Sequence, residues 1–110
     1  MNSVDDHKSK DKHGAMLKRY RQYLLLEKSL SPNTLEAYMD DALKLLGYMD
    51  DCGTDLTEVS LDDLHGFAAA MGDIGIAPRS QARIISGAKS LFRFLLLDGY
   101  RQDDPSELLE

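Results

Sequence analysis

The chain has 110 residues, of which 43% are apolar and 29% are charged, and its net charge is −6. This length and composition indicate one soluble globular domain with a modest single core. The longest apolar runs, such as residues 94–97, are far too short to span a membrane, and we expect no signal peptide. The single Cys52 excludes an internal disulfide and is typical of a protein of the reducing cytoplasm.

The first residues differ in character from the rest of the chain. They carry balanced charge and almost no aliphatic side chains, so we expect residues 1–14 to form a disordered tail and residues 15–110 to form the folded domain. His7 and His13 lie in this tail without a cysteine or carboxylate at ligand spacing on a rigid element. We therefore expect no metal site and no cofactor.

Apolar residues at helical spacing predict an all-α chain. The expected helices cover residues 15–28, residues 32–50, a shorter stretch from Ser60 to about Met71, and residues 77–97, with a short terminal helix after Asp104 and Pro105. For the second helix, Ser31 is a good N-cap and residues 33–36 offer an alternative capping box. The polar face of that helix becomes acidic at Asp40 and Asp41.

The stretch over residues 77–97 is the most informative one. Its apolar side chains gather on one side of a helical wheel and its cations on the other, and the cations are Arg79, Arg83, Lys89 and Arg93. No acidic residue lies between Asp73 and Asp98, although the whole chain is acidic. This pattern is compatible with a contact to a polyanion and equally with an ordinary solvated helix face.

An internal near-repeat relates two of the predicted helices. When the sequence is shifted by 46 residues, the helix that begins at Pro32 overlays the helix that begins at Pro78. Apolar positions then coincide: Ala42 with Ala88, Leu45 with Leu91, Leu46 with Phe92 and Met49 with Leu95. The copies differ in charge, because Asp40 and Asp41 fall on Ser86 and Gly87. The repeat favours two helical hairpins that pack across one core.

Two patterns together resemble a known family. The first is Leu30-Ser31-Pro32-Asn33-Thr34-Leu35 followed by Ala37, Tyr38 and Asp41, and the second is Ser80, Arg83, Ser86, Ala88, Ser90 and Phe92-Arg93-Phe94 followed by Asp104-Pro105. In order and spacing, residues 16–110 resemble the N-terminal core-binding domain of Xer-type tyrosine recombinases and phage integrases. The resemblance implies a four- to five-helix SAM-like bundle of two helical hairpins.

The resemblance also implies a function. In this family the core-binding domain clamps one face of a recombination half-site in double-stranded DNA, opposite a separate catalytic domain, and subunits assemble into a tetrameric synapse. The helices that begin at Pro32 and Pro78 then approach the major groove. The residues that this assigns to DNA contact are Thr34, Tyr38, Arg79, Ser80, Arg83, Lys89 and Arg93.

Position along the helix divides the cations by role. The N-terminal residues of a helix enter the major groove first, so Arg79 and Arg83 are expected to reach base edges. Lys89 and Arg93 lie two to three turns further along and are expected to meet phosphates. The family's catalytic arginines and nucleophilic tyrosine have no counterpart in the matching residues, so we expect no enzymatic activity from this chain alone.

Two other interpretations remain open at the level of sequence. One is a helical protein-interaction module whose basic face meets an acidic partner. The other is a regulator that occupies recombination sites without cleaving them. A salt titration of duplex DNA binding distinguishes the interaction module from a DNA-binding domain.

Overall fold

The computed structural model describes residues 12–110, and within them the chain is helical without a strand. The elements are α2 (Gly14–Leu26), α3 (Pro32–Asp51), a 3-10 turn η1 (Leu56–Glu58), α4 (Leu61–Asp73) and α5 (Pro78–Leu97). The all-α class and the first four predicted helices are confirmed. The first helix ends two residues earlier than expected, and the next ends one residue later.

Local sequence explains where the helices begin. The Ser31 hydroxyl accepts a hydrogen bond from the Thr34 amide at 3.4 Å, so Ser31 is the N-cap of α3 rather than the alternative box over residues 33–36. Ser60 and Asp63 form the reciprocal capping box at α4. Helix α5 starts at Pro78 after Ala77, which provides no side-chain cap.

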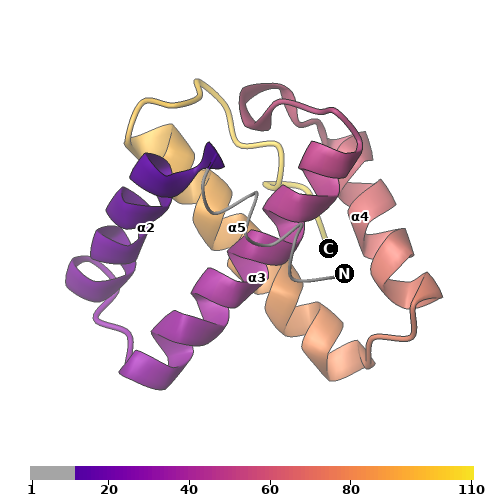
Figure 1. The fold of residues 1–110 in the computed structure, drawn as a ribbon, viewed down its shortest axis with the longest axis horizontal. Coiled ribbons are helices and arrows are strands. Elements are labelled where there is room, and N and C mark those ends of the chain that lie inside the picture. Colours follow the sequence, from indigo (N-terminus) through magenta and orange to yellow (C-terminus); the bar gives the residue numbers. More distant parts are fainter. Residues whose placement is uncertain (1–11) are drawn as a thin grey trace.

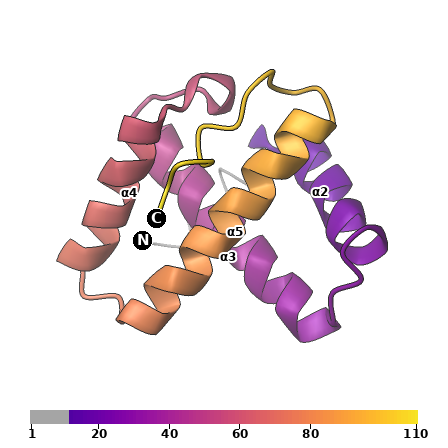
Figure 2. The same cartoon turned by 180° about the vertical axis from the view of Figure 1, so that it is seen from behind.

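The four helices form two hairpins related by an approximate twofold axis. Helices α2 and α3 make one hairpin, and α4 and α5 make the other (Figure 1). A half turn about the vertical axis exchanges α3 with α5 and α2 with α4 and gives a closely similar arrangement (Figure 2). Helices α3 and α5 cross at the centre, and the two hairpins pack across one core, as the near-repeat predicted. The equivalent positions Asp41 and Gly87 meet there, with an ideal Cβ at Gly87 only 3.2 Å from the Asp41 Cβ.

The core lies between the hairpins. Leu45 and Leu46 of α3 and Leu91 and Phe92 of α5 are each no more than 1% exposed and belong to one core cluster. The outer helices cover it with matched residues, which are Leu17, Tyr20 and Leu24 on α2 and Leu64, Phe67 and Met71 on α4. The fold therefore places the polar starts of α3 and α5 outside one shared apolar centre.

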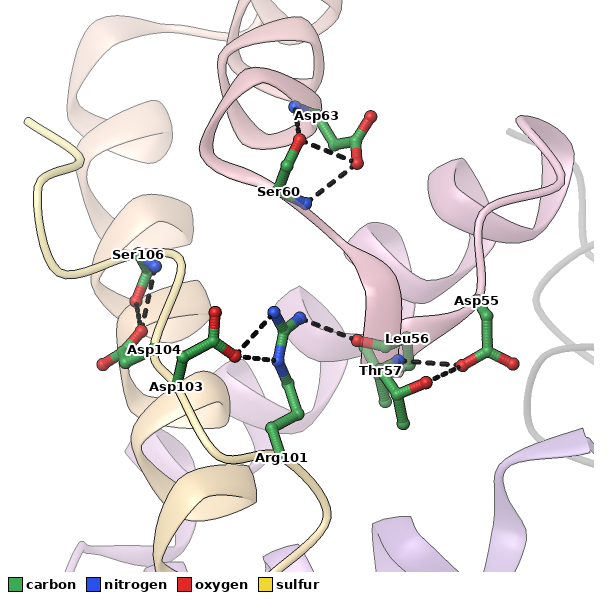
Figure 3. Close-up of polar contacts among 9 residues, drawn as sticks. All are labelled: Asp55, Leu56, Thr57, Ser60, Asp63, Arg101, Asp103, Asp104 and Ser106. Carbon is green, nitrogen blue, oxygen red and sulfur yellow. Dashed lines mark hydrogen bonds and ion pairs between the residues drawn. The ribbon is translucent and has the colours of Figure 1, made fainter.

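The C-terminal segment corrects one expectation. Residues 105–108 form hydrogen-bonded turns instead of a terminal helix. Arg101 anchors this segment, because its buried guanidinium donates to Asp103 and to the Leu56 carbonyl at 3.0 Å (Figure 3). The guanidinium also lies 5.4 Å from the centre of the Phe92 ring. Within the segment, the Ser106 amide donates to the Asp104 carboxylate, and the Glu107 and Leu109 amides donate to the carbonyls of Asp104 and Ser106, so only single turns form.

The predicted tail divides into two parts. Residues 1–11 lie outside the described residues. Lys12 and His13 both contact the Asp50 carboxylate, at 3.2 and 3.3 Å, and Gly14 begins α2. The described fold thus starts before the expected boundary at residue 15. Within residues 12–110, no helix is both long and apolar enough to cross a membrane.

Candidate functional site

The first turns of α3 and α5 lie at the same edge of the molecule, where both helices diverge from their crossing (Figures 1 and 2). Neither first turn carries an acidic residue. The first turn of α4, in contrast, carries Asp62 and Asp63. The free amides of a helix start carry a partial positive charge, which a first-turn carboxylate would offset. The α3 and α5 starts keep that charge, and we call this edge the N-terminal edge.

Helix α5 adds cations to the N-terminal edge and to its outer face. Arg79 and Arg93 are exposed and Lys89 is half-buried. None of these three side chains forms an ion pair with another residue in the described part of the chain. Ser80, in the first turn, is half-buried. Three predicted residues therefore hold charges that remain available to an anionic partner.

Arg83 has a different environment. Its Nε and Nη2 donate to the two carboxylate oxygens of Asp41, at 3.0 and 2.9 Å. These hydrogen bonds, together with the attraction between the charges, raise the pKa of the Arg83 guanidinium above its usual value. Arg83 is thus a partly exposed arginine inside an ion pair, and not the freely moving cation that the wheel suggests.

The two predicted residues of α3 lie on the helix face that leads toward the crossing. Thr34 is exposed, and its hydroxyl oxygen accepts a hydrogen bond from the Ser31 hydroxyl at 2.9 Å. Tyr38 is half-buried one turn further along, near the fully buried Tyr20. Burial raises the pKa of the Tyr20 phenol, and Tyr38 adds to the effect. Thr34 is therefore available for contact, while Tyr38 presents only part of its ring.

The cations of α2 are mostly engaged within the protein. Arg19 makes two hydrogen bonds of 2.7 Å with Asp98, and Arg21 pairs with Glu36. Helix α2 packs beside α5, and the Tyr20 hydroxyl donates to Ser90 at 3.1 Å. The basic character that the sequence shows for α2 is thus largely neutralised by internal pairs.

Asp41 is the residue whose role sequence reasoning missed. The sequence places it on the wet acidic face with Asp40, but this is wrong, because the Asp41 side chain is 0% exposed. It occupies the helix crossing opposite Gly87, whose missing side chain leaves room for the carboxylate. The repeat contained the signal, since it aligned an acid with a glycine at a point that two crossing helices must share.

An apolar groove runs between α3 and α4 and reaches Ile76 in the loop that leads into α5. Ile74, Tyr48 and Phe67 are among its lining residues, with Asp40 and Asp51 also in the lining. Ile74 is 73% exposed. The groove joins apolar groups with two acids and with Lys44, so it lacks the run of cations that marks the outer face of α5.

The fold and the site together define a class: a small all-α SAM-like domain of two crossed helical hairpins. The chain belongs to the phage integrase N-terminal SAM-like domain family, whose sequence model matches residues 17–99. The resemblance that the sequence suggested is therefore confirmed.

Similar proteins with known names are tyrosine recombinases, which is consistent with this family. The chain is 30% identical to the tyrosine recombinase XerD of Rhizobium meliloti and 33% identical to that of Yersinia pestis, each over 100 residues that make up 91% of this chain. It is 37% identical to the tyrosine recombinase XerD of Listeria innocua over 93 residues, and these residues make up 83% of this chain. The matches cover 32%, 33% and 31% of those proteins, so the chain spans about a third of their length.

Proposed function

We propose that this chain is the DNA-binding N-terminal domain of a site-specific tyrosine recombinase, which clamps a recombination half-site and helps to assemble a synapse with other recombinase subunits. One observation carries the DNA contact. Two helix starts without first-turn acids share one edge, and cations that form no ion pair within residues 12–110 extend from that edge along α5.

The chemistry of this edge suits a duplex. Helix starts and exposed side chains such as Arg79 attract phosphate, and a helix that points its start into the major groove brings its first turns to the bases. Thr34 and Ser80 occupy equivalent first-turn positions on α3 and α5 and can donate hydrogen bonds. Lys89 and Arg93 lie further along α5, where they would meet the backbone.

The same proposal assigns binding, and not cleavage, to this chain. The relatives are about three times as long, and the catalytic residues of the recombinase would belong to the part outside the match. Tyr20, a candidate nucleophile by residue type, is 0% exposed and donates to Ser90. Incubation with a nicked duplex substrate should therefore give no covalent protein–DNA adduct in denaturing electrophoresis.

The alternative function is a helical protein-interaction module whose basic face binds an acidic partner. The same free cations of α5 support this alternative. The two functions differ in what the partner must present, because a duplex offers regularly spaced phosphates and groove edges, whereas an acidic polypeptide offers charge alone.

Fluorescence anisotropy with labelled duplex DNA tests the proposal. The chain should bind with an affinity that falls steeply with salt, by about 0.9 in the log–log slope for each phosphate contact. Polyglutamate of equal charge should compete poorly. A variant Arg79→Gln/Lys89→Gln/Arg93→Gln should lose most of the slope, whereas Lys18→Gln on α2 should not. Preferential binding of polyglutamate would favour the interaction module.

A further inference from the structure

The crossing of α3 and α5 holds a buried carboxylate in a fixed position. The Asp41 side chain is 0% exposed, and Arg83 covers both of its oxygens. The Lys44 ammonium lies further away, at 3.9 Å. Gly87 leaves no free space on the opposite side, because a Cβ there would stand 3.2 Å from the Asp41 Cβ and 3.5 Å from its Oδ2. The carboxylate therefore has one arrangement.

The Arg83 side chain is 47% exposed, so only part of its guanidinium faces the carboxylate. Nε and Nη2 use one N–H each toward Asp41. The protons of Nη1 and the second proton of Nη2 lie on the outer edge of the same planar group. That edge can form two parallel hydrogen bonds to a single acceptor pair. Loss of Arg83 would leave a buried charge unpaired, which keeps the two groups together.

We propose that Asp41 is a positioning residue that turns Arg83 into an oriented donor for base recognition on DNA. The proposal rests on the proposed function and deepens it. Arg79, Lys89 and Arg93 have no such partner among the described residues, so no internal carboxylate fixes the direction of their charged groups. The Arg83–Asp41 pair has almost no net charge, but the outer edge of the Arg83 guanidinium has a fixed direction. It adds sequence selectivity rather than general affinity.

This division of roles gives a measurable signature. Replacement of the Asp41 carboxylate by the isosteric amide removes one negative charge and releases Arg83. The freed cation should steepen the log–log salt slope by about 0.9 on any duplex. The loss of orientation should at the same time lower the preference for the selected sequence by about tenfold, within the range that one bidentate base contact provides. A purely structural carboxylate would leave the sequence preference of the folded protein unchanged, because only the net charge would differ.

The test uses two labelled duplexes, the sequence that the wild-type chain enriches from a randomised pool and a scrambled version of it. Anisotropy at several salt concentrations measures the salt slope and the sequence preference for wild type, Asp41→Asn and Asp98→Asn. Asp98 is the matched control, since it forms an equally bidentate pair with Arg19 at the far end of α5. Asp98→Asn should keep the wild-type preference, and circular dichroism checks that each variant is folded.

A second variant decides the matter if Asp41→Asn does not fold. Arg83→Lys keeps the charge and the Asp41 carboxylate but loses the planar fork. It should lower the sequence preference by about tenfold and leave the salt slope unchanged. An unchanged preference in the folded variants would overturn the positioning role of Asp41 and leave the proposed function intact. Absence of salt-dependent binding by the wild-type chain would overturn both.

Discussion

Replacement of Gly87 by alanine tests whether close contact between α3 and α5 determines the fold. In an exposed helix interior, alanine is favoured over glycine by about 1 kcal/mol. At Gly87 the new Cβ would lie 3.2 Å from the Asp41 Cβ, closer than the ~3.5–4.0 Å at which carbon atoms pack well. Asp41 cannot move aside easily, because Arg83 holds both carboxylate oxygens.

The two effects oppose each other, and the structure indicates which is larger. Overpacking of a tight contact costs about 1–3 kcal/mol, so Gly87→Ala should be destabilised by up to about 2 kcal/mol after the helix preference is included. Gly72 provides the matched control, since it lies in α4 with no atom within 4 Å of an added Cβ. Gly72→Ala should be stabilised, by up to about 1 kcal/mol.

Urea denaturation followed by far-UV circular dichroism measures both variants. The free energy of unfolding should be about 1–3 kcal/mol lower for Gly87→Ala than for Gly72→Ala. If Gly87→Ala were at least as stable as Gly72→Ala, the helices would not be in the contact described, and the reasoning about Asp41 would fail with it.

Three further predictions concern stability. Phe92→Ala should lose roughly 3–5 kcal/mol in urea denaturation, because the ring is 0% exposed, whereas Leu108→Ala, at a side chain 76% exposed, should change by less than about 0.5 kcal/mol. Arg101→Met should destabilise the domain by about 1–3 kcal/mol, since it removes the hydrogen bonds of a buried guanidinium and leaves the partly buried Leu56 carbonyl without its donor; equal midpoints would refute this anchor. The hydrogen bonds from Arg19 lower the pKa of Asp98, so this pair stabilises the fold above the ordinary aspartate value, about 3.9, and loses its effect as pH falls through the lowered pKa. The stability gap between wild type and Asp98→Asn should therefore shrink in acid, and a constant gap would contradict the assignment.

The sequence was sufficient to predict the helices and their pairing. Helical periodicity and caps such as Ser60 depend on neighbours in the chain, so they could be read locally. The overlay of Leu45 on Leu91 and of Leu46 on Phe92 depends on a repeat, and all four residues are buried in one core cluster. The predicted terminal helix was wrong, because the amides of that segment bond to Asp104 and Ser106 in single turns instead of continuing a helical ladder.

The charges were harder to predict, because ion pairs join residues far apart in sequence. Arg83 and Asp41 are separated by 42 positions, and Arg19 and Asp98 by 79. A helical wheel assigns each of these residues to a polar face but cannot show that they meet. The assignment of DNA contacts consequently remains a prediction. It is best supported for the three cations that form no ion pair within residues 12–110. The predicted contacts are Thr34, Tyr38, Arg79, Ser80, Arg83, Lys89 and Arg93.

The central claim is that the N-terminal edge of α3 and α5 faces the duplex, and site-directed photocrosslinking tests it most directly. The exposed Cys52 is first replaced by serine, and a single cysteine with a crosslinker is then placed at Thr34, Ser80 or Glu58. Glu58 belongs to η1, at the opposite edge of the molecule (Figure 1).

Crosslinks to labelled duplex DNA should form from positions 34 and 80 and be nearly absent from position 58, with yields that fall as salt rises. Equal yields from all three positions, or crosslinks from position 58 alone, would contradict the proposed orientation of the domain on DNA.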